Sequence, residues 1–216
     1  MMKQQQTWHQ QLRNHHREEL VQAGATLFLQ RNFPDITVKD VCDQAGISRV
    51  TFYKHFRDMN ELVLDVQIHI LRDMTERLTA SDLPQTNGRQ RLAGILQAWV
   101  DYAFTHGKEL RFVALFDLYY EQMRVDDELR QRYAQFVQHG TGRDFLQDAL
   151  EQGVRDGSLK PQLDVSHAGV LIFQTVMGVL QRVSMTSTPE LQDRHEGDVV
   201  VQPVIDMLLD YVAAPQ

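Results

Sequence analysis

Basic, hydroxyl-bearing and aromatic side chains are concentrated in residues 48–55. Arg49 is able to donate two hydrogen bonds to a guanine edge, and Val50 is able to pack against the methyl group of a thymine. Neighbouring side chains suit phosphate oxygens, and these are Thr51, Tyr53, Lys54 and His55. Phe52 and Phe56, four residues apart, fall on one face of a helix. The spacing therefore predicts a helix with a buried aromatic face and a second face that fits a DNA groove.

A shorter helix and a tight turn are expected directly before this segment. Thr37 and Ser48 stand at the N-cap positions of two successive helices. Gly46 lies between them and provides the break that the turn of a helix-turn-helix usually needs. The simpler alternative is an ordinary helical hairpin with a solvated polar face. Two caps, a glycine turn and an aromatic pair agree on one geometry, which favours the helix-turn-helix.

The run from Leu20 to Leu71 resembles the N-terminal domain of the TetR family of bacterial transcriptional regulators. The resemblance is carried by LFLQRNF (27–33), TVKDVCDQAGIS (37–48), RVTFYKHF (49–56) and DMNEL (58–62), and it covers about a quarter of the chain. It implies a homodimeric, ligand-responsive repressor that binds a near-palindromic DNA operator. In such a protein the helix that begins at Ser48 enters the major groove.

Base and phosphate contacts are expected from different residues. Arg49 and Val50 are the candidates for base contacts, and Lys39 is a further one. Residues at family positions that contact phosphates are Thr37, Thr51, Tyr53, Lys54 and His55. Many relatives have a phosphate-binding lysine where this chain has Met59, which cannot make that contact, and Arg57 is the candidate substitute.

The net charge of −7 is distributed unevenly along the 216 residues. Residues 1–60 hold eight Lys and Arg against six Asp and Glu, a balance of +2, whereas the remainder holds 14 against 23, a balance of −9. Positive charge is thus kept near the expected DNA-binding segment. The single cysteine, Cys42, excludes an internal disulfide and is expected in the core. No run of 18 apolar residues and no apolar N-terminal segment is present, which favours a cytoplasmic, nucleoid-associated protein.

Hydrophobic periodicity predicts an all-α fold with two domains and a tail. The expected divisions are a polar tail over 1–13, a helix-turn-helix DNA-binding domain over 14–57, and an effector-binding and dimerisation domain over 58–216. Asp58 is expected to cap the fourth helix, with Glu61 completing a capping box. Further helices are expected at about 14–31, 89–105, 108–121, 126–155, 165–183 and 199–212, with a linker over 81–88 and a loop over 187–197.

The helices over 165–183 and 199–212 are apolar around much of their circumference. Burial of each helix within its own subunit would explain one apolar face. The surplus apolar faces favour contact with a second subunit, and the resemblance implies a four-helix dimer interface at these helices.

Aromatic residues are dense in the middle of the chain and recur at helical spacing. One interpretation is a core stripe, and the other is an apolar ligand cavity with polar tips. The resemblance implies a cavity between the fourth and the seventh or eighth helices. The candidate ligand-binding residues are Trp99, Tyr102, Phe116, Tyr119, Tyr120 and Phe173.

Motifs for catalysis, cofactor binding or metal binding are not apparent. A di-iron helical bundle needs Glu-x-x-His pairs, and none of the nine histidines has a Glu three residues before it. Asp164 and His167 are spaced as a helix cap rather than as metal ligands. We therefore expect a regulator and not an enzyme, without metal or cofactor. The alternatives are a DNA-binding protein of the same fold that responds to no small molecule, and a helical carrier or enzyme that retains the hairpin.

Overall fold

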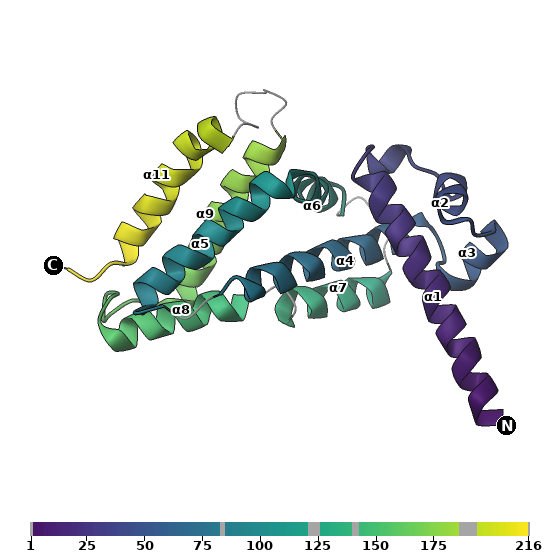
Figure 1. Cartoon of the computed structure of the whole chain (residues 1–216), viewed down its shortest axis with the longest axis horizontal. Helices are drawn as coiled ribbons and strands as arrows, with labels where there is room; N and C mark the ends of the chain where they lie inside the picture. Colours follow the sequence, from purple (N-terminus) through teal and green to yellow (C-terminus); the bar gives the residue numbers. More distant parts are fainter. Residues whose placement is uncertain (1, 83–84, 121–125, 140–142, 186–193, 216) are drawn as a thin grey trace. The chain divides into compact units, whose positions relative to one another are not determined.

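The computed structural model describes residues 2–82, 85–120, 126–139, 143–185 and 194–215, and within these ranges the regular structure is helical (Figure 1). The α-helices are α1 (Met2–Phe28), α2 (Val38–Ala45), α3 (Arg49–His55), α4 (Met59–Ala80), α5 (Gly88–Thr105), α6 (Gly107–Tyr120), α7 (Asp127–His139), α8 (Arg143–Asp156), α9 (Val165–Met185) and α11 (Arg194–Val212). A short 3-10 helix covers Phe33–Asp35. The prediction of an all-α fold is confirmed.

The chain forms two compact units. The first combines residues 1–71 with 115–138, and the second combines residues 72–114 with 139–216. α4 and α6 are each divided between the two units. The division expected at residues 57 and 58 therefore does not coincide with the boundary between the units, because the first half of α4 and all but the end of α7 pack with the helix-turn-helix.

Helices α1, α2 and α3 pack on one another in the first unit (Figure 1). α1 also lies close to α4 at Gly24, where an added Cβ would be 3.1 Å from Val66 Cγ2. Apolar side chains from all four helices form the core, and the fully buried ones include Leu20, Val41, Phe52, Phe56, Leu62 and Val66. The mutual packing of these helices is what holds the short α3 in a helical conformation.

Helix α5 packs closely against α8 in the second unit. Gly88 starts α5, and a Cβ at this position would lie 2.0 Å from the backbone nitrogen of Gly153 in α8. The absence of a side chain at Gly88 allows the two backbones to approach. The carboxylate of Asp156 also accepts a hydrogen bond from the Gly88 amide at 2.7 Å. This crossing joins the first turn of α5 to the last turns of α8.

Helices α9 and α11 pack against each other and against α5 (Figure 1). By length and composition alone, α9 is apolar enough to cross a membrane. However, α9 also packs on α8, and one of its faces is buried, including Ile172, Val176 and Leu180. These contacts are those of a core helix, which passes the same composition test.

Several helix boundaries differ from those expected. α1 begins at Met2 instead of about residue 14, because the Gln-rich start of the chain contains no proline or glycine that would interrupt a helix. The helix expected over 126–155 is two helices, α7 and α8, and the sequence between them contains Gly140 and Gly142, residues of low helix propensity. α11 begins at Arg194, within the loop expected over 187–197. The rest of that loop to residue 193, and residues 83–84 of the linker, lie outside the described residues.

Candidate nucleic-acid interface and cavity

The start of α2 is fixed by a reciprocal capping box. The Asp40 amide donates to Thr37 Oγ1 at 3.3 Å, and the Thr37 amide donates to Asp40 Oδ2 at 2.8 Å. The hydroxyl of Thr37 donates to the same carboxylate oxygen at 2.6 Å. Hydrogen bonds from Thr37 lower the pKa of Asp40, so this cap stays charged at neutral pH. The Thr37 hydroxyl already serves the helix, and it remains exposed beside the start of α2.

A glycine ends α2 and a serine starts α3, as the sequence predicts. Gly46 has φ of 67°, in the left-handed region where a side chain is strained, and the next amide, Ile47, donates to the Cys42 carbonyl at 3.0 Å. Ser48 Oγ accepts the Thr51 amide at 3.1 Å and therefore caps α3. The glycine turn at Gly46 and the serine cap at Ser48 together define the angle between α2 and α3.

Two aromatic rings attach α3 to the first unit. Phe52 and Phe56 are buried, and their ring centroids are 5.5 Å apart. Cys42 of α2 is buried in the same unit, and burial raises the pKa of its thiol, as expected for a core cysteine.

The opposite side of α3 presents a continuous exposed face. At about 100° per residue, Arg49, Tyr53, Val50 and Lys54 follow one another around the helix in that order. All four are exposed, and the two apolar ones have exposed fractions of 71% for Val50 and 59% for Tyr53. Val50 and Tyr53, three residues apart, are neighbours on this face, and adjoining exposed apolar side chains are more informative than a single one. Arg49 forms no ion pair with any residue that the structure describes, so its guanidinium is available to a ligand.

Thr51 and His55 lie on the flank of this face and are half-buried. The Thr51 hydroxyl is 3.0 Å from Ser48 Oγ, and the His55 ring meets the His16 ring of α1 edge-on at 6.0 Å. Thr51 and His55 thus have partners within the first unit, whereas the four residues of the exposed face are largely open to solvent. The structure therefore divides the predicted α3 residues into an exposed set and a flanking set.

Two other basic residues have acidic partners. Lys39 Nζ is 2.5 Å from Asp43 Oδ2, and this hydrogen bond raises the pKa of Lys39. Both side chains are largely exposed, so the pair is weak and easily exchanged for another anion. Arg57 instead contacts Asp126 and Glu61. The substitution of Arg57 for the missing phosphate-binding lysine is therefore disfavoured, because its guanidinium is already held between two carboxylates.

The cap expected for α4 is present with one change of partner. Asp58 Oδ1 accepts the Glu61 amide at 3.0 Å, as predicted. Glu61 Oε2, however, accepts the amide of Arg57 at 2.8 Å, one residue before the cap. The same carboxylate oxygen is 3.4 Å from Arg57 Nε. Glu61 therefore anchors the segment that joins α3 to α4.

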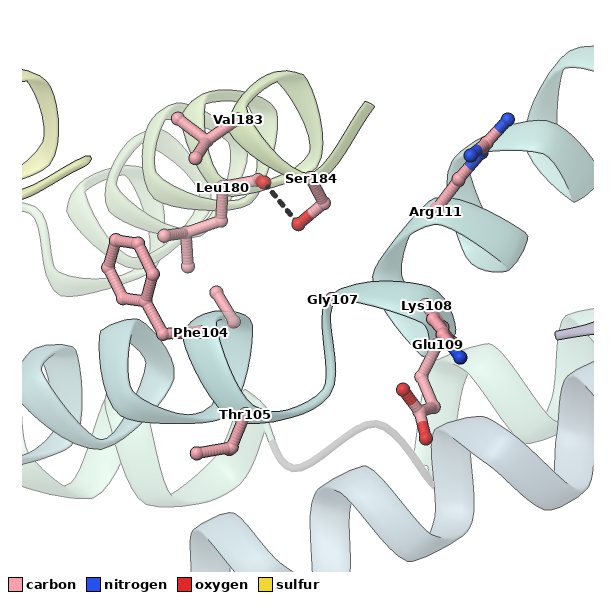
Figure 2. A pocket seen from close by; sticks show the side chains of 10 residues that line it. Phe104, Thr105, Gly107, Lys108, Glu109, Arg111, Leu180, Val183 and Ser184 are labelled. Carbon is pink, nitrogen blue, oxygen red and sulfur yellow. Dashed lines mark hydrogen bonds between the residues drawn. The ribbon is translucent and has the colours of Figure 1, made fainter. Parts of the chain in front are cut away.

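A cavity of about 580 Å³ lies in the second unit, at the turn between α5 and α6 and beside the end of α9 (Figure 2). Its lining consists of Ala103, Phe104, Thr105, Gly107, Lys108, Glu109, Arg111, Leu180, Val183 and Ser184. Figure 2 shows Phe104 and Leu180 on one side of the opening and the α6 residues Lys108 and Arg111 on the other. Ser184 Oγ donates to the Leu180 carbonyl at 2.9 Å. The volume lies within the range of small-molecule sites, and the lining is a mixture of polar and apolar groups.

The six aromatic residues expected to bind a ligand do not gather in this cavity. Trp99 packs edge-on against Phe173 at 5.6 Å, and Tyr102 stacks on His106 at 4.4 Å. Tyr102 lines a separate groove of about 470 Å³ between α4 and α5, and Phe173 lines a pocket of about 80 Å³. In the first unit, Phe116 and Tyr120 pack on each other and on Tyr133, and Tyr119 meets Phe33 edge-on at 5.6 Å.

The sequence contains weak signals for the buried acids of α4 and for the cavity at Gly107. Glu61 and Asp65 are carboxylates four residues apart that flank the apolar run 62–64, which indicates acids near the core with basic partners. Gly107 breaks the chain between two apolar helices, where a cavity can open. Nothing local indicated that Leu180 and Val183 would face that break, because this depends on how α9 crosses α5.

Comparison with known proteins assigns the chain to a family. Residues 20–66 match the family described as bacterial regulatory proteins, tetR family. The chain is 30% identical over 149 residues to the HTH-type transcriptional repressor KstR2 of Mycolicibacterium smegmatis, over 69% of this chain and 70% of that protein.

Solved structures agree in fold. The ketosteroid transcriptional regulator KstR2 of Mycobacterium tuberculosis has a TM-score of 0.60 at 22% identity, covering 92% of this chain and 95% of its own. The fatty acid degradation regulator FadR from Bacillus halodurans has a TM-score of 0.66 at 18% identity, covering 90% and 94%. The chain belongs to the TetR family of bacterial regulatory proteins and is a DNA-binding transcriptional regulator.

Proposed function

We propose that this protein is a cytoplasmic repressor that acts as a homodimer on a near-palindromic operator and releases it when a small molecule binds. The observation that carries the proposal is the exposed face of α3, where Arg49, Val50, Tyr53 and Lys54 are open to solvent while Phe52 is buried. A short helix held this way on a rigid hairpin fits the major groove. The protein acts by binding and not by catalysis.

Base reading is assigned to Arg49 and Val50, with Lys39 as a further contact once it leaves Asp43. Arg49 would fork onto a guanine, and Val50 would cover a thymine methyl group. Phosphate contacts are assigned to Thr37, Thr51, Tyr53, Lys54 and His55, and Ser48 caps the reading helix. Phosphate contacts position the protein on DNA, whereas base contacts select the sequence.

Two substitutions test this division of labour. Arg49→Ala is expected to lose about 1–3 kcal/mol on the preferred site and to relax selection at one base position. Tyr53→Phe removes only a hydroxyl and is expected to weaken binding to every sequence by a similar factor. The measurement is the affinity of each variant for a panel of DNA fragments that differ at single base pairs. Equal losses across all fragments for both variants would contradict the assignment.

Dimerisation is assigned to the exposed sides of α9 and α11. These adjacent helices leave several large apolar side chains in solvent, namely Val170, Leu171, Met185, Val199, Val200, Met207 and Tyr211. The occupant we propose is the same pair of helices in a second copy of the chain, because an apolar surface of this kind normally marks an interface. The domain roles follow: residues 14–57 read DNA, and residues 58–216 bind the effector and dimerise.

A charge placed in this surface tests the dimer. Met207 has an exposed fraction of 61%, so Met207→Glu is compatible with the folded subunit but would bury a carboxylate in a dimer. Sedimentation equilibrium should show the wild type as a dimer and Met207→Glu as a monomer. Gln90→Glu, an exposed position on α5, adds the same charge and should remain dimeric. A dimer of unchanged stability in Met207→Glu would place the interface elsewhere.

The effector site is assigned to the 580 Å³ cavity rather than to the six aromatic residues expected from the sequence. Its lining combines apolar side chains with Lys108, Glu109 and Arg111. Two similar proteins are named for ketosteroids and for fatty acid degradation. We therefore propose that the effector is an apolar molecule with a polar end, and that steroid- and fatty-acid-derived compounds are the first to screen.

A pair of glycine substitutions distinguishes this cavity from the groove. A Cβ at Gly107 would have only Ser184 Oγ within 4 Å, at 3.9 Å, so the first side-chain atom of Gly107→Leu is accommodated and the rest occupies the cavity. Gly94, in the 470 Å³ groove, has open space around its Cβ position, and Gly94→Leu is the matched control. A compound that raises the melting temperature of the wild type should fail with Gly107→Leu and act on Gly94→Leu. The reverse result would move the effector to the groove.

A further inference from the structure

Three arginines and three carboxylates of the first unit form a series of alternating ion pairs, here called the ring, that reaches the C-terminal end of α3. Arg17 of α1 lies 2.5 Å from Asp65 and 3.5 Å from Glu61, both on α4. Asp65 also binds Arg132 of α7, and Glu61 binds Arg57 at 3.4 Å. Arg57 in turn binds Asp126, which caps α7 by accepting the Leu129 amide at 3.0 Å. The series of pairs therefore starts at Arg132 and ends at Asp126, and α7 connects these two residues and closes the ring.

Burial distinguishes the two α4 carboxylates of this ring from those of ordinary surface ion pairs. The side chains of Glu61 and Asp65 have exposed fractions of 12% and 15%. Neighbouring residues on α4, Leu62, Leu64 and Val66, are fully buried. Two carboxylates so placed need the surrounding guanidinium groups, because a buried charge without its partner is strongly unfavourable. The helices α1, α4 and α7 of this unit are therefore restricted to arrangements that keep all the ion pairs.

Arg17 connects the ring to the recognition helix itself. Its Nη1 donates to the backbone carbonyl of His55, the last residue of α3, at 2.5 Å. Its guanidinium also covers the Phe56 ring, with 4.4 Å from Cζ to the ring centroid. The last carbonyls of a helix lack partners within the helix, and a cation there is favourable. The planar guanidinium with its several donors serves His55 and Asp65 together, which an ammonium group cannot reproduce.

We infer that Arg17 is a positioning residue for DNA binding and that α7 sets the position of α3 through it. The path runs from Arg132 to Asp65, from Asp65 to Arg17, and from Arg17 to the carbonyl of His55. The inference rests on the proposed role of α3 as the DNA-reading helix. A shift of α7 that withdraws Arg132 leaves Asp65 paired with Arg17 alone, which draws the Arg17 guanidinium toward Asp65 and away from the carbonyl at the C-terminal end of α3. The ring is thus the route by which a movement of α7 reaches the DNA-binding face of α3.

The test uses the full-length protein and a DNA fragment that the wild type selects from genomic DNA. Arg17→Met keeps the apolar stem over Phe56 and removes the donors. Arg132→Met breaks the far end of the path. Arg91→Met is the matched control, because Arg91 forms a comparably buried ion pair with Asp82 at 2.5 Å in the second unit. All affinities are measured below the melting temperature of each variant, across a salt series.

Arg17→Met is expected to lose about tenfold in affinity for the selected fragment while the salt dependence stays that of the wild type. Arg132→Met should show a smaller loss, and the double variant should lose less than the two single losses combined, because both act on one path. Arg17→Lys should fall between the wild type and Arg17→Met. Arg91→Met should bind as the wild type does. If Arg17→Met lowered the salt slope by about one, Arg17 would be a phosphate contact and the inference would be wrong.

Hydrogen exchange without DNA provides a readout that is independent of the operator. The Phe56 amide donates to the Phe52 carbonyl at 3.0 Å and reports on the last turn of α3. Its exchange should be faster in Arg17→Met and Arg132→Met than in the wild type, and unchanged in Arg91→Met. Unchanged exchange in Arg17→Met would overturn the inference. A wild type that selects no fragment but shows the expected exchange pattern would instead contradict the proposed function.

Discussion

The close approach of α5 and α8 predicts a large effect from adding one methyl group. In Gly88→Ala the new Cβ would lie 2.0 Å from the nitrogen and 2.3 Å from the Cα of Gly153, and 2.7 Å from the Ala149 carbonyl oxygen. All three are backbone atoms, so no side chain can rotate away. The two helices must separate by roughly 1 Å or more, and overpacking of this kind costs about 1–3 kcal/mol or more. For a chain of this size the melting temperature should fall by roughly 2 to 12 °C.

The matched control is in the same helix. Gly94 has nothing within 4 Å of its Cβ position, and its φ is not in the left-handed region. Gly94→Ala should therefore stabilise the protein by about 0.5–1 kcal/mol, because alanine is the better helix former. Thermal unfolding followed by circular dichroism measures both variants at equal protein concentration. A Gly88→Ala variant as stable as Gly94→Ala would refute the described crossing of α5 and α8.

Two further predictions concern titrating groups. Cys42 is buried with a raised thiol pKa, so in the native protein it should react with a thiol reagent only at the rate of local opening, and at once in denaturant; rapid labelling of the native protein would contradict its placement. Burial raises the pKa of Tyr133 to about 12, whereas an unfolded tyrosine ionises near pH 10. The stability that Tyr133 contributes by staying neutral is therefore fully present below about pH 10 and lost as the pH rises through about 12. Tyr133→Phe should show a smaller loss of stability over this window in denaturant titrations, and an identical pH profile would count against the burial of this phenol.

Local chemistry explains what could be predicted from the sequence. Thr37, Gly46 and Ser48 act on groups within five residues of themselves, so the boundaries of α2 and α3 follow from residue type alone. The all-α class follows in the same way from periodicity. Dense family motifs also identify the recognition helix from the sequence alone.

Long-range packing explains what could not be predicted. Aromatic spacing shows that Trp99 and Tyr102 lie on a helix, but the crossing of α5 with its neighbours decides whether either faces a cavity. Arg17 and Asp65 are 48 residues apart, and Asp65 and Arg132 are 67 apart. No helical period relates such positions. The contact of Gly88 with Gly153 is similarly invisible, because two isolated glycines carry no sign of each other.

Sequence-specific binding of DNA through α3 is the central claim, and one selection experiment tests it most directly. Purified protein is incubated with fragmented genomic DNA from its source at moderate salt, and the retained fragments are sequenced. We predict a short near-palindromic motif with half-sites about 34–36 Å apart, or a multiple of that spacing. Preference at one symmetric base position should be lost with Arg49→Ala. Uniform retention of all fragments, alike for the wild type and Arg49→Ala, would contradict the account.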